Sequence, residues 1–142
     1  MFTLSDKSVK KVVSQPGPDG NPDFSPDGKS IVFTSAMGNP KFFYSNSRLA
    51  IVPVGGGTPK SITDTFDEDP NFIAWKMDGI YFSAAQKTAA HLFRVDPAAG
   101  AITRVSQPDD LILGSLTFTK DGRTVAFTAP SPTSLSEVFV SS

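Results

Sequence analysis

The feature that most constrains the fold is a motif that occurs three times: an aromatic residue, two further residues, and then Asp-Gly. The three copies are Phe24 to Asp27-Gly28, Trp75 to Asp78-Gly79, and Phe118 to Asp121-Gly122. The aspartates are separated by 51 and then by 43 residues, and a short β-branched and aromatic run follows each Asp-Gly. Asp accepts turn hydrogen bonds and Gly adopts positive φ, so Asp-Gly between two such runs is typical of a β-hairpin.

A second hairpin follows the first in two of the three copies. Residues 49–54 lead through three glycines to residues 61–63, and residues 92–95 lead through a turn to residues 102–106. Four short strands every 40 to 50 residues, roughly, are typical of a β-propeller blade. The sequence therefore predicts an all-β chain that forms a partial β-propeller. An immunoglobulin-like sandwich also has many short strands, but it gives no reason for the recurring Asp-Gly motif.

The two ends of the chain predict a blade that is divided between them. Residues 13–16 repeat residues 105–108 letter for letter, as Val-Ser-Gln-Pro, so the chain is expected to begin on the fourth strand of a blade. The predicted divisions are the fourth strand of the split blade in 1–16, complete blades in 17–63 and 64–107, and the first three strands of the split blade in 108–142.

Three blades are fewer than the minimum of about four in a closed propeller. An arc of three exposes the apolar faces of its first and last blades, and such faces favour association. We therefore expect either that this chain is cut from a larger parent or that copies of it assemble into a homo-oligomer. A dimer would give six blades, in which residues 9–14 of one chain complete the blade formed by residues 116–140 of the other.

Composition excludes several classes of function. The charges of 13 Lys and Arg and 14 Asp and Glu nearly cancel, which argues against a nucleic-acid partner. The sequence contains no long apolar run and no signal peptide, so no membrane partner is expected and a cytoplasmic location is predicted. The absence of cysteine excludes disulfides, thiolate nucleophiles and Cys-based zinc sites.

The motif also carries a family resemblance. Residues 24–33, Phe-Ser-Pro-Asp-Gly-Lys-Ser-Ile-Val-Phe, resemble the Pro-Asp type of WD-like repeat found in the Tol-system propeller and in the N-terminal propellers of the prolyl oligopeptidase family. Residues 34–40, 66–70 and 91–97 look most like the acylaminoacyl or dipeptidyl peptidase branch of that family. The resemblance implies a serine peptidase whose propeller covers the active site of an α/β-hydrolase domain and limits access to short peptides.

The sequence departs from that family in one decisive respect. It contains no Gly-x-Ser-x-Gly nucleophile elbow, so no catalytic residue can be carried over. We expect no catalytic, cofactor-binding or metal-binding residue in this chain, and a gating role in the parent peptidase. The alternative is an independent propeller-type binding module for a protein or a carbohydrate, assembled from identical chains.

Two segments are candidates for contact with a partner. Residues 35–47 form the longest predicted connection and contain Phe42, Phe43 and Tyr44, which either pack back on their own blade or contact another molecule. Asp67 and Glu68 lie with Asp69 in an acidic cluster that either attracts a peptide N-terminus or a cation or forms a solvated loop.

The remaining singled-out residues are expected to be structural. His91 is the single histidine, and nothing in the sequence supplies it with a nucleophile and an orienting carboxylate. The aromatic and Asp-Gly residues of the three motifs are expected to form cores and turns. Loss of Trp75 is expected to leave a large void in a core.

Overall fold

The fold consists of short strands and one 3-10 helix. The structure is a computed structural model and describes residues 8–107, 112–131 and 133–142. The elements are β1 (Asp19–Phe24), β2 (Ser30–Ser35), η1 (Phe42–Tyr44), β3 (Arg48–Pro53), β4 (Lys60–Ser61), β5 (Asn71–Lys76), β6 (Gly79–Gln86), β7 (Ala89–Val95), β8 (Ile102–Arg104), β9 (Leu116–Phe118), β10 (Val125–Ser131) and β11 (Ser134–Ser141).

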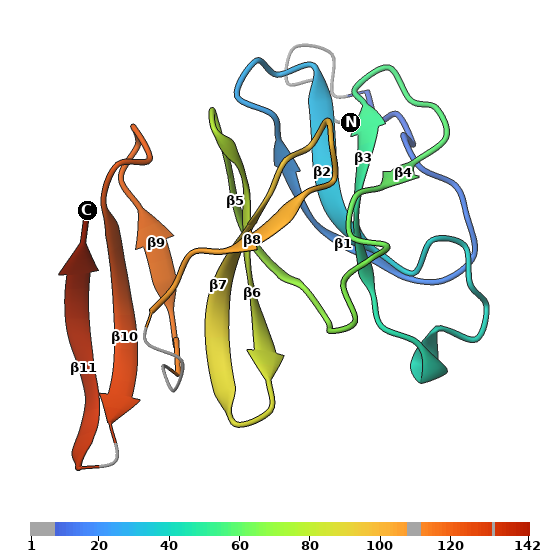
Figure 1. Ribbon diagram of the computed structural model, residues 1–142. Coiled ribbons are helices and arrows are strands. Elements are labelled where there is room, and N and C mark those ends of the chain that lie inside the picture. The colour runs from blue at the N-terminus through green and yellow to red at the C-terminus, as the bar shows by residue number, and fades with distance from the viewer. Residues whose placement is uncertain (1–7, 108–111, 132) are drawn as a thin grey trace.

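The strands form three antiparallel sheets. The first sheet has the order β1-β2-β3-β4, the second β5-β6-β7-β8, and the third β9-β10-β11. The sheets lie side by side in chain order (Figure 1), and β5 contacts β1 and β2 of the first sheet and β9 of the third. The predicted all-β fold class is confirmed. Within the described part of the chain, no helix is long and apolar enough to cross a bilayer.

Apolar side chains fill the two spaces between neighbouring sheets. Between the first and second sheets, Leu49 packs in one cluster with Phe82 and Phe93. Between the second and third sheets, Tyr81 and Leu92 pack with residues of β9 and β10. These side chains alternate along their strands, because successive residues of a strand point to opposite faces of the sheet. The second sheet therefore packs one face on the first sheet and the other face on the third.

The aromatic residues of the three motifs are less buried than the sequence predicts. Trp75 is half-buried and packs on the first inter-sheet core, and the Phe118 ring lies 4.7 Å from the Tyr81 ring. Phe24 is 52% exposed, because no sheet precedes the first one within the described residues. The side chain that fills the centre of the first core is Phe82, which is fully buried. The void expected at Trp75 is therefore smaller than the void expected at Phe82.

The first and third Asp-Gly turns share the same hydrogen bonds. The Ser25 hydroxyl donates to Asp27 Oδ1 at 2.6 Å, and the Thr119 hydroxyl donates to Asp121 Oδ1 at the same distance. A main-chain N–H two residues after each aspartate donates to the same Oδ1, and the following glycine of each turn has positive φ. The predicted role of these two motifs as hairpin turns agrees with this geometry.

The second Asp-Gly turn differs from the expected pattern. Lys76 stands where the other two turns have Ser25 and Thr119, and Lys76 pairs with Gly79 across a two-residue loop. Asp78 therefore accepts no hydroxyl bond inside the turn. Its Oδ2 instead accepts from the Tyr81 hydroxyl at 2.7 Å and lies 3.6 Å from the Arg94 guanidinium. Asp78 thus lies in the hairpin loop between β5 and β6, but its carboxylate contacts side chains of β6 and β7 and not the hydroxyl residue of its own turn.

The first and third turns make the stability depend on pH. The Ser25 and Thr119 hydroxyls, followed by main-chain N–H donors, hold the pKa of Asp27 and of Asp121 below the ordinary value. A carboxyl with a lowered pKa in the folded state stabilises the fold fully above its unfolded pKa, about 3.9, and this contribution is lost as the pH falls through the folded pKa.

Asp27→Asn combined with Asp121→Asn is expected to flatten this pH dependence. The urea midpoint of the native sequence should fall more steeply below about pH 4 than that of the double variant, measured at several values from about pH 7 downward. Asp64→Asn, at an exposed carboxylate outside both turns, is the matched control. Equal acid slopes in the native sequence and the double variant would contradict the role assigned to the two turns.

The segment before β1 packs on the first sheet. Val12 and Val13 contact a cluster of Phe33, Ala50 and Val52. β11 pairs with β10, and the described residues show no pairing between β11 and residues 9–15. The fourth strand that the sequence predicts for the third sheet is thus not supplied by the N-terminal segment within one chain.

Candidate functional site

Two loops meet at one end of the first two sheets. Residues 36–47 connect β2 to β3, and residues 62–70 connect β4 to β5. The Asn46 side-chain amide donates to the main-chain oxygen of Asp67 at 2.7 Å. The N–H and hydroxyl of Ser47 donate to Asp69 Oδ1 at 2.7 and 2.9 Å. These contacts bring the aromatic segment and the acidic cluster to one surface.

The three consecutive aromatic residues form the helix η1 and differ in burial. Phe42 is half-buried, and its ring lies 4.0 Å from the Phe43 ring. Phe43 is 83% exposed and Tyr44 is 90% exposed. Phe42 therefore packs partly against its own surroundings, whereas Phe43 and Tyr44 present apolar surface at the end of the first sheet.

A cleft of about 460 Å³ lies between these loops and the ends of β1 and β2. We call it the loop cleft, and the residues that matter to its chemistry are Asp19, Ser35, Phe42, Phe43, Asn46 and Asp69. Asp19 Oδ1 accepts from the Ser35 hydroxyl at 2.7 Å and from the Gln15 side-chain amide at 3.0 Å. The Asp19 and Asp69 carboxylates are thus held in place by hydrogen bonds on one oxygen each.

The loop cleft combines carboxylate and aromatic side chains. A carboxylate has more acceptor capacity than the bonds above use, so Asp19 and Asp69 can accept from a cationic ligand group. The rings of Phe42 and Phe43 provide an apolar wall beside them. Among the described residues, no group of three His, Asp or Glu side chains lies close enough to hold a metal ion.

The structure separates the predicted contact residues into different roles. Asp67 holds the loop through its main-chain oxygen, and its side chain is exposed, while Glu68 is half-buried. Asp69, a member of the predicted acidic cluster, lines the loop cleft together with Asp19, which sequence reasoning did not predict as a contact residue. Each aspartate stands next to Gly or Pro in the sequence, which signals a turn but gives no sign that the two carboxylates line one cleft.

His91 is buried and lies away from the loop cleft. Its Nδ1 is 3.1 Å from the Ser106 hydroxyl, which also accepts from the Leu92 N–H at 3.0 Å. In the first sheet, the Thr63 hydroxyl accepts from the Leu49 N–H in the same way. Ser106 and Thr63 therefore each accept a hydrogen bond from a main-chain N–H of the third strand in their sheet. The contact between His91 and Ser106 supports a structural role for His91.

The comparison with curated proteins found one partial relative. Over 93 residues the chain is 33% identical to dipeptidyl-peptidase 5 of Porphyromonas gingivalis. The match covers 64% of this chain and 14% of that protein. The chain thus spans about a seventh of the length of the relative. No family model matches the chain.

The solved structures that resemble the chain are β-propellers. The crystal structure of TolB from Acinetobacter baumannii matches with a TM-score of 0.70 and 22% identity, over 96% of this chain and 33% of TolB. A prolyl endopeptidase structure matches with a TM-score of 0.61 and 21% identity, over 85% of this chain and 17% of the endopeptidase. These matches confirm that the three sheets form a partial β-propeller. Over 93 residues the chain is also similar in sequence to a dipeptidyl peptidase.

Proposed function

We propose that this chain is a non-catalytic propeller segment of a prolyl oligopeptidase-type serine peptidase, in which it limits the peptides that reach the active site. The observation that carries the proposal is the 33% identity to dipeptidyl-peptidase 5 over 93 residues. Because the sequence lacks a nucleophile elbow, the serine nucleophile belongs to another part of the parent protein. This chain contributes shape and charge around the substrate path.

The loop cleft suits such a role. A short peptide has an ammonium group at its N-terminus and apolar side chains close behind it. The carboxylates of Asp19 and Asp69 attract the ammonium group, and the rings of Phe42 and Phe43 pack on the apolar side chains. We place the substrate-facing surface of the propeller at this end of the sheets.

The exposed residues around the loop cleft contact the hydrolase domain in this proposal. Phe43 and Tyr44 project apolar surface that water does not favour. Asp67 and Glu68 lie on the neighbouring loop and add negative charge to the same surface. A partly apolar and partly acidic surface fits an interface between domains better than a solvated face.

The test uses the native protein in cells that produce this sequence. Antibodies raised against the chain should detect a polypeptide much larger than 15.1 kDa. The same polypeptide should react with a fluorophosphonate probe, because an activated serine nucleophile attacks the probe and becomes covalently labelled. Heat-denatured lysate serves as the control for non-specific labelling. A large polypeptide that the probe does not label would contradict the proposal.

The second candidate is an independent binding module for a protein or a carbohydrate, assembled from identical chains. The observation that favours it is that the first sheet carries an apolar groove on one side and the third sheet exposes Val138 and Val140 on the other. In the antibody experiment this candidate predicts a polypeptide close to 15.1 kDa that the probe does not label. The two candidates therefore give opposite results in one experiment.

A further inference from the structure

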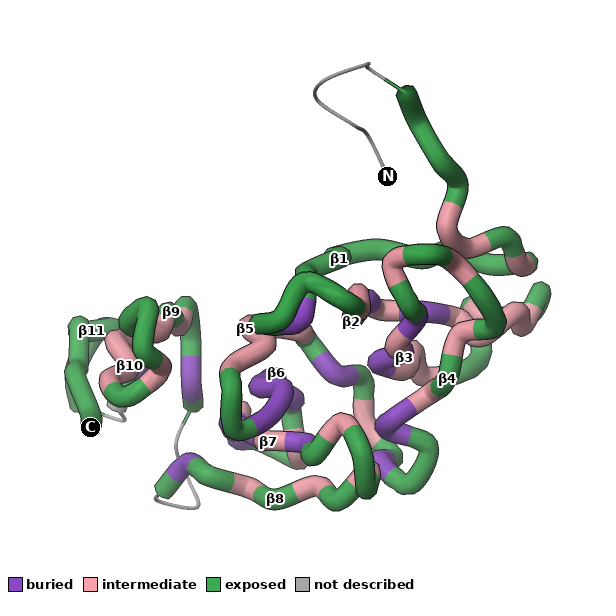
Figure 2. Tube along the Cα trace, turned by 90° about the horizontal axis from the view of Figure 1, so that it is seen from above, coloured by how far each residue is buried: buried purple, intermediate pink, exposed green. Residues whose placement is uncertain are grey.

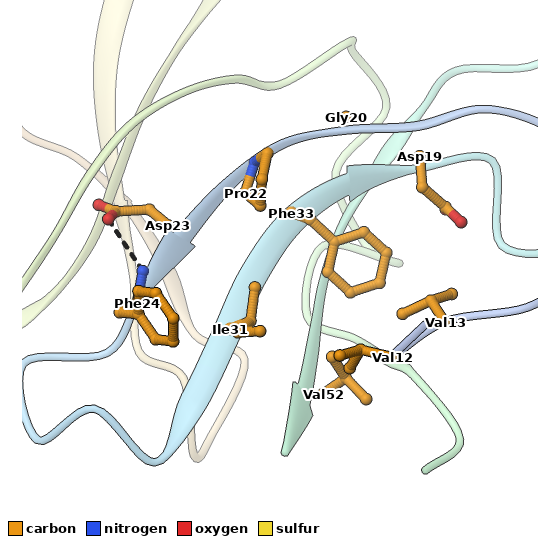
Figure 3. Close-up of a pocket in the computed structure, with 10 residues that line it drawn as sticks. All are labelled: Val12, Val13, Asp19, Gly20, Pro22, Asp23, Phe24, Ile31, Phe33 and Val52. Atoms are coloured by element: carbon orange, nitrogen blue, oxygen red, sulfur yellow. Dashed lines mark hydrogen bonds between the residues drawn. The ribbon is translucent and has the colours of Figure 1, made fainter. Parts of the chain in front are cut away.

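The first sheet has an apolar face toward the N-terminal side, which the N-terminal segment covers only in part: Phe33 and Val52 are buried, whereas Phe24 is 52% exposed. A groove of about 440 Å³ runs along this face (Figure 3). Phe24, Ile31, Phe33 and Val52 line it, and Val12 and Val13 of the N-terminal segment lie along its other side. Apolar side chains of a neighbouring sheet fill the equivalent space between the first and second sheets and between the second and third, but not in this groove.

Four residues of this face, three of which line the groove, correspond to residues that are buried in the second sheet. The two sheets have the same register, since Val32 pairs with Ile51 as Tyr81 pairs with Arg94. Under this register Phe33 corresponds to Phe82. The remaining correspondences are Ile31 with Ile80, Ala50 with Phe93, and Val52 with Val95. All four residues of the second sheet are buried, in the core between that sheet and the first. The groove therefore has the pattern of a face that receives another sheet.

The third sheet has the matching open face at the other end of the chain. Val138 is 76% exposed and Val140 is 70% exposed, on a strand that is exposed throughout its length (Figure 2). Val140 pairs with Ala126 and corresponds to Ile51, so Val138 corresponds to Leu49. Leu49 is fully buried where the first sheet packs on the second. By this correspondence, Val138 and Val140 lie on the face of the third sheet that would pack on a further sheet.

The N-terminal segment already occupies the place of a fourth strand that belongs to a preceding sheet. By sequence, Val13 corresponds to Val105 and to Ile62, which follows β4. Ile62 packs on the second sheet within the first inter-sheet core, and Val13 packs in the same way on the first sheet. The segment therefore lies beside the position that the missing sheet would fill.

We propose that a second copy of this chain fills the groove, with its third sheet packed on the first sheet of its neighbour. Residues 10–12 of the neighbour then pair with β11 of the inserted sheet as its fourth strand. In the register of the second sheet, where Val95 pairs with Ile102, Ser141 of one copy lies opposite Lys10 of the other. Ser14 takes the position of Ser106 and accepts from the Val138 N–H.

Two copies of the chain form a closed ring of blades. The interface joins two different surfaces, so each copy has one groove and one inserting sheet, and such contacts form rings when the rotation closes. Two copies give six blades, within the range of about four to eight found in closed propellers. The inference concerns how this chain covers its own faces, and it does not rest on the proposed peptidase function.

The first test measures the mass of the purified chain by light scattering. The native sequence is expected to have twice the 15.1 kDa mass of one chain. Val138→Asp together with Val140→Asp places charge in the interface, and the variant should have the single-chain mass. Leu135→Asp on the same strand is the matched control, because Leu135 is 89% exposed and corresponds to Asn46 in a loop. Phe43→Ser with Tyr44→Ser should also leave the mass unchanged.

The proposal would be overturned if the native sequence stays monomeric at every concentration at which it is soluble. The two apolar faces would then pack against other blades of a longer polypeptide. A variant at Val138 and Val140 that associates as the native sequence does would overturn it as well.

The second test checks the register with a disulfide. The chain has no cysteine, so Lys10→Cys combined with Ser141→Cys introduces the two thiols that can react. Directly opposite residues of antiparallel strands have Cα atoms about 4.5 to 5.5 Å apart, within the range for a disulfide. Oxidation should give a covalent dimer on a non-reducing gel. Lys10→Cys combined with Leu135→Cys is the control, and equal cross-linking of both pairs would contradict the register.

Discussion

Phe82→Ala is expected to lower the free energy of unfolding by about 3 to 5 kcal/mol, the range for removing a fully buried aromatic ring. Phe82 is 0% exposed and lies in the core between the first and second sheets. Its ring centroid is 5.1 Å from that of Phe66 in an edge-to-face arrangement and 5.4 Å from that of Phe93 in a stacked one. Both contacts are lost with the ring, and the surrounding strands close the void only in part.

Urea unfolding followed by the fluorescence of Trp75 measures this loss. Trp75 is the single tryptophan and packs on the same core, so its emission reports on the contact between the two sheets. All variants are compared at one protein concentration, because association adds to apparent stability. Met77→Ala, at a side chain that is 90% exposed, is the control and should change the free energy of unfolding by less than about 0.5 kcal/mol.

A milder substitution keeps the prediction testable if the alanine variant does not fold. Phe82→Leu retains most of the apolar volume and should cost about 1 kcal/mol. A loss below about 1 kcal/mol for Phe82→Ala would show that the first and second sheets do not share one core. The same result would weaken the inference that an equivalent core forms between two copies.

The sequence predicts the second and third strands of each sheet well, and the physical reason is their periodicity. Residues such as Val32, Phe33 and Val52 alternate between two buried faces, and a run of β-branched and aromatic residues indicates a strand with apolar contacts on both sides. All three turns are predicted from Asp-Gly, and a hairpin forms at each of them. The hydrogen bonds of the second turn are not predicted, because Lys76 stands where the other two turns have a hydroxyl residue.

The candidate site cannot be predicted from strand periodicity or turn motifs. The hydrogen bond from Asn46 to Asp67 joins residues that are 21 positions apart, and it depends on how the second sheet is placed against the first. Strand periodicity contains no information about that placement. For the same reason the sequence does not show that Asp19 and Asp69 line one cleft, or that Phe24 remains exposed in the groove while Trp75 and Phe118 are half-buried.

Ser106→Ala is expected to lower the free energy of unfolding by about 1 to 3 kcal/mol, the cost of leaving buried polar groups without partners. The Ser106 hydroxyl accepts from the Leu92 N–H and contacts His91 Nδ1, and all three residues are buried. Water cannot replace the hydroxyl without opening the edge of the second sheet. A small change in volume would by itself cost much less, so the loss reports on the hydrogen bonds.

Two further variants separate the hydrogen bonds from the volume. Ser106→Thr should retain most of the stability, because Thr63 makes the equivalent bond to Leu49 in the first sheet. Ser136→Ala, at an exposed serine of β11, should change the free energy of unfolding by less than about 0.5 kcal/mol. Hydrogen exchange adds a local readout, since the Leu92 amide should lose protection in the alanine variant and keep it in the threonine variant. Equal protection of that amide in both variants would show that Ser106 does not hold the third strand of the second sheet.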